Sequence, residues 1–175
     1  ISGAGKPTLS QKLADLLGYE AFNEPVEDNH YLADFYGDMN RWGAMMQLHL
    51  LFRRFEQHQR IVWNKQKGAV QDRTIYEDSI FAKMLVGLNL MEERDYRNYQ
   101  SLFRHMSNFM CRPNVIVYLD VSAERSMERI NMRSRGVESG ISLEYLEALY
   151  RGYEEFIADI SKLTPVIRVD YDRFP

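Results

Sequence analysis

The first residues of the chain combine small residues with one cation, as a phosphate-binding loop does. The sequence opens Ile-Ser-Gly-Ala-Gly-Lys-Pro-Thr, in which Gly3 and Gly5 precede Lys6. Glycines let backbone N–H groups approach phosphate oxygens, and the helix that follows directs its positive end at them. Lys6 would add a point charge for the β and γ phosphates of a nucleotide. The stretch Gly3–Thr8 is therefore a candidate nucleotide-binding loop.

Pro7 departs from the usual loop, in which a Ser or Thr follows the lysine and binds Mg²⁺ through its hydroxyl. Proline is acceptable in a first helical turn, because the N–H groups there have no helical partner. It has no hydroxyl, however, so Thr8 is the alternative metal ligand. The loop's earlier glycine and its preceding strand would lie before Ile1. The competing interpretation is a glycine-rich turn that caps an ordinary helix.

Charged side chains stand where two strand-like segments end. Glu24 follows Tyr19–Phe22 and precedes a proline, and Asp72 with Arg73 follows Ala69–Gln71. In open α/β sheets, ligands bind outside the carboxyl ends of the strands. We therefore expect these three side chains to meet the phosphate loop in one crevice. The competing interpretations are a strand-ending carboxylate and a surface ion pair.

Three arginines, Arg129, Arg133 and Arg135, lie close together near the end of a helical stretch. Guanidinium groups bind phosphate through paired hydrogen bonds and neutralise a transferring phosphoryl group. The three are therefore candidates for a phosphate clamp. A solvated, salt-bridged helix face is the alternative, because Glu124 and Glu128 have the same four-residue spacing as Arg129 and Arg133.

Short β-branched runs alternate with longer helical stretches, which predicts an α/β fold with a parallel sheet. The strand candidates are Tyr19–Phe22, Ala69–Gln71, Asn114–Leu119 and Val166–Val169. The helix candidates are Thr8–Leu17, Arg41–Asn64, Glu77–Leu88, Glu92–Phe109, Ala123–Met132 and Leu143–Ile160. The run Val115–Leu119 is apolar at every position, which predicts a central strand covered on both faces.

The longest helix candidate should bury one face. Apolar residues recur along it at intervals of three and four, as in a buried stripe: Met45, Leu48, Phe52 and Phe55. Gln47 and Arg54 are seven residues apart, so they project from one side and need polar partners there. A nucleobase edge would provide such partners, with Asp78 pairing with Arg54. Ordinary hydrogen bonds on the helix surface are the alternative.

Composition bounds the class of protein. The chain has 175 residues, 45% of them hydrophobic and 27% charged, which suits one globular domain. Its formal net charge of −3 gives no support to binding of a nucleic acid polymer. No segment approaches the roughly 18 uninterrupted apolar residues of a membrane span. Cys111 is the one cysteine, so no internal disulfide can form and a reducing compartment is expected.

Read together, the motifs resemble those of the deoxyribonucleoside kinases, the family of deoxyadenosine, deoxyguanosine and deoxycytidine kinases. The motifs that carry the resemblance are Gly3–Lys6, Glu24–Val26, Phe35-Tyr36, Asp72–Tyr76, and Arg133–Arg135 leading into Gly140–Leu146. The resemblance implies a three-layer P-loop kinase fold with a five-stranded parallel sheet, whose first strand this chain lacks. It also implies one kinase domain over residues 1–175, with an arginine-rich lid at about 129–140.

The resemblance assigns roles to individual residues. Glu24 is similar to the family's general base for the 5′-hydroxyl, and Arg73 to the arginine that holds the same end. The implied catalytic set is Glu24, Arg73, Lys6, Arg129 and Arg133. The ATP-binding set is Gly3, Ala4, Gly5, Lys6, Pro7, Thr8, Arg133, Arg135, Asp170, Asp172 and Phe174. The deoxynucleoside-binding set is Glu24, Tyr36, Gln47, Arg54, Arg73, Asp78, Phe81 and Glu138. Asp72 and Thr8 are the implied ligands of Mg²⁺.

The implied activity is transfer of the γ-phosphate of ATP to the 5′-hydroxyl of a deoxynucleoside, with deoxyadenosine or deoxyguanosine expected as substrate. A homodimer is expected from the family, and a cytoplasmic location, or a mitochondrial one if a leader is missing. A catalytically weakened nucleotide-binding or structural member of the same fold is one alternative, motivated by Pro7. A nucleoside-monophosphate kinase is another, because it shares the fold and the phosphate loop.

Overall fold

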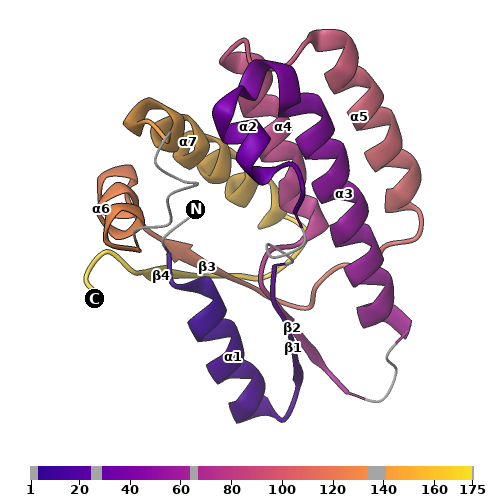
Figure 1. Ribbon diagram of the computed structural model, residues 1–175. Coiled ribbons are helices and arrows are strands. Elements are labelled where there is room, and N and C mark those ends of the chain that lie inside the picture. Colours follow the sequence, from indigo (N-terminus) through magenta and orange to yellow (C-terminus); the bar gives the residue numbers. More distant parts are fainter. Residues whose placement is uncertain (1–3, 25–28, 64–66, 134–140, 175) are drawn as a thin grey trace. The chain divides into compact units, whose positions relative to one another are not determined.

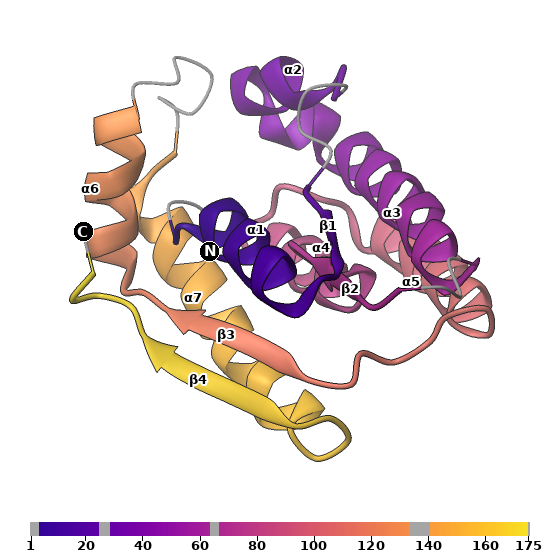
Figure 2. The ribbon, with the colours of Figure 1, turned by 90° about the horizontal axis from the view of Figure 1, so that it is seen from below.

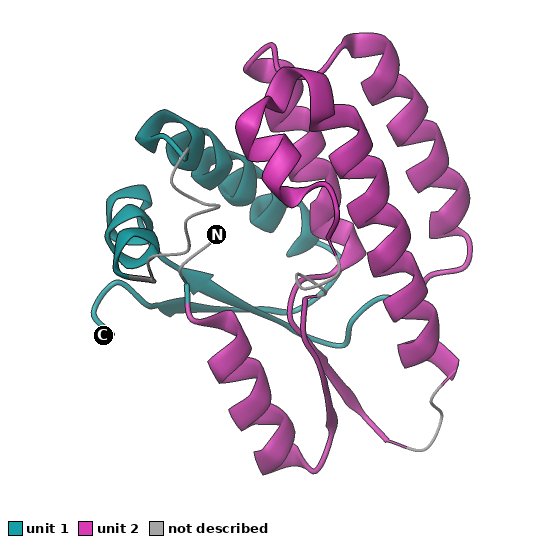
Figure 3. Ribbon diagram, viewed as in Figure 1, with its two compact units in different colours: residues 1–4, 112–175 teal, residues 5–111 magenta. Residues whose placement is uncertain are grey.

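The computed structural model describes residues 4–24, 29–63, 67–133 and 141–174, although for Arg133 it describes the backbone alone (Figure 1). The chain divides into two compact units (Figure 3). Unit 2 comprises Gly5–Cys111, and unit 1 comprises Arg112–Pro175 together with Ile1–Ala4. Both units combine helices with parallel strands, so the expected mixed α/β class is confirmed.

Unit 2 places a short parallel sheet among helices. Its elements are α1 (Lys6–Leu17), β1 (Glu20–Phe22), α2 (Leu32–Gly37), α3 (Met39–Trp63), β2 (Ala69–Gln71), a 3-10 turn η1 (Ile75–Glu77), α4 (Asp78–Gly87) and α5 (Glu93–Ser107). Strand β1 runs parallel to β2, with Glu20 opposite Ala69 and Phe22 opposite Gln71. Helix α1 packs against both strands (Figure 2). Because the two strands run parallel, the residues that follow them leave the sheet at the same end.

Unit 1 contains a second parallel pair. Its elements are β3 (Ile116–Asp120), α6 (Ala123–Arg133), α7 (Leu143–Ile160) and β4 (Val166–Asp170). Strands β3 and β4 pair in parallel over their whole length. Helix α7 covers one face of β3, where the rings of Tyr118 and Tyr153 stack at 6.2 Å. Val115 and Val117 are exposed among the described residues, so the expectation of burial on both faces is wrong for this strand.

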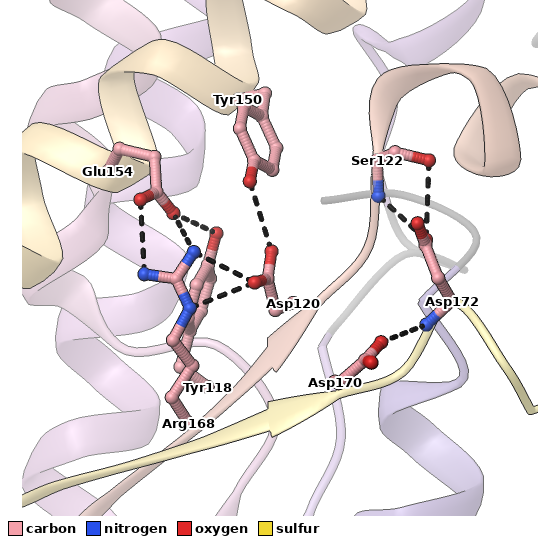
Figure 4. A network of polar contacts seen from close by, with 8 residues as sticks. All are labelled: Tyr118, Asp120, Ser122, Tyr150, Glu154, Arg168, Asp170 and Asp172. Atoms are coloured by element: carbon pink, nitrogen blue, oxygen red, sulfur yellow. Dashed lines mark hydrogen bonds and ion pairs between the residues drawn. The ribbon is translucent and has the colours of Figure 1, made fainter.

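A polar network joins β3, β4 and α7 (Figure 4). Arg168 of β4 lies 2.8 Å from a carboxylate oxygen of Asp120 and 2.9 Å from one of Glu154. Tyr118 donates to Glu154 at 3.3 Å, and Tyr150 donates to Asp120 at 3.2 Å. The guanidinium of Arg168 thus links β4 to β3 and to α7.

The sequence locates most elements to within two residues, but it does not predict helix α2. The buried face of α3 also differs from the prediction. In α3, Met45 and Phe52 are 45% and 56% exposed, so the predicted apolar stripe is wrong. The buried positions of α3 are instead Gly43, Met46, Gln47, Leu51, Arg54 and His58. Half of this set is polar, and a search for apolar periodicity cannot find a helix face that buries polar groups.

Two buried contacts fix α3 within unit 2. A Cβ atom added to Gly43 would lie 2.7 Å from the carbonyl oxygen of Leu90, so the helix and the turn after α4 meet at backbone distance. Near the other end, Nε2 of His58 accepts a hydrogen bond of 2.8 Å from the backbone N–H of Cys111. Burial lowers the pKa of His58, which favours the neutral ring that this bond requires. Among the described residues, no helix is long and apolar enough to cross a membrane.

The corrected face of α3 can be tested with two neighbouring residues. Leu51 is 1% exposed and Phe52 is 56% exposed. Leu51→Ala should lower the free energy of unfolding by about 2–5 kcal/mol, because it leaves a cavity in the core. Phe52→Ala should lower it by less than about 1 kcal/mol. Urea unfolding of the two variants measures the difference, and a larger loss for Phe52→Ala would contradict this orientation of α3.

Candidate active site

The carboxylate of Glu24 is shared by two arginines. Glu24 lies two residues after the end of β1. One of its oxygens is 2.6 Å from Nη2 of Arg54, which comes from α3. The other is 3.0 Å from Nε of Arg73, which lies two residues after the end of β2. The strand ends and α3 therefore converge on one ionised carboxylate, as the sequence predicts for Glu24 and Arg73.

Arg54 also contacts a second carboxylate. Its Nη1 pairs with Oδ1 of Asp78 at the start of α4, and the two side chains are only 2% and 1% exposed. The pairing expected from the sequence is thus present. A guanidinium that is buried this deeply needs compensating charge, because its hydration is lost. Glu24 and Asp78 provide that charge from two sides.

The backbone of Arg73 adopts a left-handed conformation that is uncommon for a residue with a side chain, with φ of 64°. Such strain persists where surrounding contacts hold it, and it is frequent at functional sites. Here Glu24 binds the guanidinium, whose central carbon lies 4.9 Å from the centre of the Phe81 ring. Phe81, an expected deoxynucleoside contact, packs on Arg73 in this structure.

The turn after Arg73 is closed by a capping box. Thr74 accepts from the backbone N–H of Glu77, and the Glu77 carboxylate accepts from the backbone N–H of Thr74 at 3.1 Å. This reciprocal pair fixes the start of η1 and, directly after it, α4 with Asp78. Glu77 is not among the residues predicted for the site, although the spacing Thr-x-x-Glu is the signal that could have identified it.

Burial and charge shift the pKa values of three groups at this site. Burial alone would raise the pKa of Glu24, but Arg73, Arg54 and Lys6 outweigh it and hold the value at about 2. For Lys6, burial and then the charge of Arg73 lower the pKa to about 8. For Asp72, burial raises the pKa against the opposing effects of Lys6 and Arg73. Lys6, Glu24, Asp72 and Arg73 thus form one electrostatic cluster in unit 2.

The described part of the phosphate loop has the expected backbone. Gly5 has a φ of 75°, which glycine adopts without strain, and α1 begins directly after it at Lys6. The helix therefore starts two residues earlier than the predicted Thr8, and Pro7 lies in its first turn. Pro7 and Thr8 are both exposed. Ala4, which precedes Gly5, is buried in unit 1.

Several buried side-chain oxygens have no hydrogen-bond partner within the described ranges. Gln47 of α3 is buried, and its Oε1 is one of these atoms. Oδ1 of Asp72 is another. Buried polar atoms normally have partners, so both are suited to a ligand. Tyr36, an expected deoxynucleoside contact, lies on α2 with its ring edge-on to Phe35 at 5.3 Å.

The candidate residues of unit 1 make local contacts. Arg129 donates to the carbonyl oxygen of Tyr171 at 2.8 Å and also to that of Phe174, so it ties α6 to the segment after β4. Asp172 accepts from the backbone N–H of Ser122 at 2.9 Å, and Asp170 accepts from the backbone N–H of Asp172 at 3.3 Å (Figure 4). The remaining candidates lie outside the described residues or, for Arg133, outside the described side chains: Gly3, Arg133, Arg135 and Glu138.

Known proteins resemble this chain over nearly its whole length. A family model described as deoxynucleoside kinase matches residues 1–175. The chain is 51% identical over 174 residues to a deoxyadenosine kinase of Dictyostelium discoideum, a match that covers 99% of this chain and 71% of that protein. It is 38% identical over 176 residues to a deoxyadenosine/deoxycytidine kinase of Bacillus subtilis (strain 168), covering 97% and 80%. The solved structure of deoxyadenosine kinase from M. mycoides with bound dCTP superposes with a TM-score of 0.87 at 34% identity, covering 98% and 87%.

The two arginines at Glu24 make unit 2 sensitive to acid. Because the pKa of Glu24 is about 2 in the folded protein and its ordinary value is 4.5, the ionised carboxylate stabilises the fold above pH 4.5. That stabilisation is lost as the pH falls toward 2, and it amounts to roughly 3 kcal/mol. Glu24→Gln removes the titrating group. The free energy of unfolding should therefore fall less steeply with acid in this variant than in the wild type. Parallel curves for the two proteins would show that Glu24 is not held in this way.

Proposed function

The chain belongs to the deoxynucleoside kinase family, and we propose that the Glu24 cluster of unit 2 receives the 5′-hydroxyl of the deoxynucleoside. The enzyme is a phosphotransferase that phosphorylates a deoxynucleoside in nucleotide salvage. The observation that carries the proposed site is the Glu24 carboxylate held by Arg54 and Arg73 at the common end of β1 and β2. ATP is the proposed phosphate donor.

Glu24 accepts a hydrogen bond from the attacking hydroxyl and takes its proton as the new O–P bond forms and the bond from the γ-phosphorus to the bridging oxygen breaks, which releases ADP. A carboxylate with a pKa of about 2 is a weak base. Phosphoryl transfer tolerates this, because its loose transition state depends on positioning and charge neutralisation more than on early proton removal. Arg73 holds the same end of the substrate and balances the charge of Glu24.

Donor binding is assigned to the phosphate loop and to unit 1. The backbone of Gly3–Thr8 and the ammonium group of Lys6 would contact the phosphates, with Arg129, Arg133 and Arg135 in a lid at about residues 129–140. Asp170, Asp172 and Phe174 would contact the adenine side. Support comes from the left-handed Gly5 at the start of α1 and from Arg129, whose guanidinium binds the segment after β4.

Deoxyadenosine is the proposed preferred acceptor, with deoxyguanosine next. The buried amide oxygen of Gln47 accepts no hydrogen bond from the described residues, so it can accept one from an exocyclic amine, and the NH₂ group can donate to a ring nitrogen. Adenine presents this donor–acceptor pair to a glutamine. The proposed base and sugar contacts are Gln47, Arg54, Asp78, Phe81, Tyr36 and Glu138. Several relatives are named deoxyadenosine kinases, which also supports this choice.

Magnesium is the proposed metal, and Asp72 is its proposed protein ligand, with Thr8 as the second candidate. Mg²⁺ prefers oxygen ligands and is usually bound by one or two carboxylates, several waters and phosphate oxygens. The donor set fits, because Asp72 has a buried carboxylate oxygen available beside Lys6 and Glu24. When bound, this ion would neutralise phosphate charge. The described residues contain no group of three or more metal-binding side chains.

We propose that residues 1–175 belong to a single kinase domain, which is supported by a family match that spans both compact units. Its sheet is the five-stranded parallel sheet expected from the sequence, and both described strand pairs are parallel, as that sheet requires. A homodimer is proposed as well, since α3 exposes Met45, Phe52 and Trp63.

The proposed acceptor chemistry is tested by ATP consumption with each deoxynucleoside and each deoxynucleoside monophosphate. We expect turnover with deoxyadenosine and none with the monophosphates. Glu24→Gln keeps the shape of the side chain and removes its basicity, so turnover should fall by about 100-fold or more while deoxynucleoside binding is largely kept. Turnover with monophosphates instead would favour a nucleoside-monophosphate kinase, and nucleotide binding without turnover a catalytically weakened member. Near-normal turnover of Glu24→Gln would remove Glu24 from the chemistry.

Pro7 has its own test, because it occupies the position where a hydroxyl usually binds the metal. Pro7→Ser would restore that hydroxyl within the first turn of α1. We expect the variant to need less magnesium for half-maximal rate and to turn over faster, with ATP affinity nearly unchanged. The measurement is a magnesium titration at saturating ATP. Equal midpoints for the two proteins would mean that Thr8 or a carboxylate already binds the metal.

A further inference from the structure

The two strands that lead into the candidate site are short. Strands β1 and β2 have three residues each. Beyond their last paired residues, the backbone N–H of Asp72 donates to the carbonyl oxygen of Phe22 at 2.8 Å. Glu24 comes two residues after Phe22. The position of Glu24 in space therefore depends on contacts other than the pairing of β1 with β2.

Gln57 of α3 makes two contacts at this place. Its Nε2 donates to the backbone carbonyl of Asn23 at 2.7 Å, and Asn23 is the residue directly before Glu24. Its Oε1 accepts from Nε2 of Gln71 at 2.8 Å, and Gln71 is the residue directly before Asp72 and Arg73. One amide group thus joins the segment that follows β1 to the last residue of β2.

Helix α3 also contacts Glu24 through a second residue, Arg54. Arg54 and Gln57 are three residues apart on α3, so they project from neighbouring positions on one face. Arg54 binds the carboxylate of Glu24, and Gln57 binds the backbone that precedes it. The side chain and the main chain of Glu24 are therefore both fixed to one rigid element.

We propose that Gln57 is a positioning residue for phosphoryl transfer, which holds Glu24 and Arg73 in register by binding the chain before each of them. This inference rests on the proposed function of Glu24. Gln57 touches no reacting atom and acts through the backbone of Asn23 and the side chain of Gln71. A misplacement of about 1 Å of a reacting group is enough to reduce turnover substantially.

The chemistry of the amide determines which substitutions are informative. Gln57→Ala removes both hydrogen bonds, whereas Gln71→Ala removes only the one that Gln71 donates. Gln57→Glu keeps the acceptor for Gln71 but turns a carboxylate toward the Asn23 carbonyl, where a donor is needed. Gln59 lies two residues further along α3 and projects from a different side of the helix, so Gln59→Ala is the matched control.

Steady-state kinetics with the proposed substrates, measured across pH, is the first experiment. Gln57→Ala should lower kcat for the deoxynucleoside about tenfold and leave the KM for ATP nearly unchanged. Gln57→Glu should show a similar loss, Gln71→Ala a smaller one, and Gln59→Ala none. The double variant of Gln57 and Gln71 should match Gln57→Ala alone, because Gln71 acts through Gln57. As Glu24 moves away from its arginines its pKa rises, so the acid limb of kcat/KM should move to higher pH.

A structural role alone would lower the melting temperature without moving the acid limb. A folded Gln57→Ala with wild-type kcat and pH profile overturns the inference, as does additivity of the two substitutions. If Gln57→Ala does not fold, Gln71→Ala decides by the same two readouts. The acid dependence of unfolding can be measured without turnover. The free energy of unfolding of Gln57→Ala should fall less steeply between pH 4.5 and 2 than that of the wild type, because Glu24 would contribute less to it. An inactive wild type would therefore reject the proposed function but leave this inference to be decided by the unfolding curves.

Discussion

An ionised carboxylate between two guanidinium groups organises unit 2. Glu24, Arg54 and Arg73 come from three separate segments, and each is held in place by the charge of another. Asp78 behind Arg54 completes the balance in a region with little water. Removing one member of such a cluster leaves an opposite charge buried without compensation. The short strands, the long α3 and the start of α4 are thus fixed relative to one another by electrostatics as much as by apolar packing.

The sequence predicted the parts of this site that follow local rules. Glu24, Asp72 and Arg73 could be placed because ligand-binding residues follow the ends of parallel strands. Arg54 could be paired with Asp78 because a cation on a buried helix face needs an anion. The buried face of α3 could not be predicted, since Gln47, Arg54 and His58 take positions that a hydrophobic pattern assigns to apolar residues. The left-handed backbone of Arg73 depends on contacts distant in sequence, and no local pattern encodes it.

The pKa values of Lys6 and Asp72 are shifted in opposite directions, and for both groups burial disfavours the charged form. Burial lowers the pKa of Lys6 and raises that of Asp72. A phosphate group favours the charged lysine, and a cation favours the ionised aspartate. In the proposed mechanism, nucleotide and metal therefore favour the charged forms that burial in the free site disfavours.

Gly43 takes no part in the proposed chemistry, but it affects how accurately α3 positions residues that do. The absence of a side chain lets α3 touch the Leu90 carbonyl, and any larger residue would push the helix away from it. Gln47 follows one turn later and Arg54 two turns after that, on the same buried face. A displacement of the helix at Gly43 would therefore move both side chains, because α3 is rigid. The accuracy with which α3 positions these two side chains therefore depends on the absence of a side chain at Gly43.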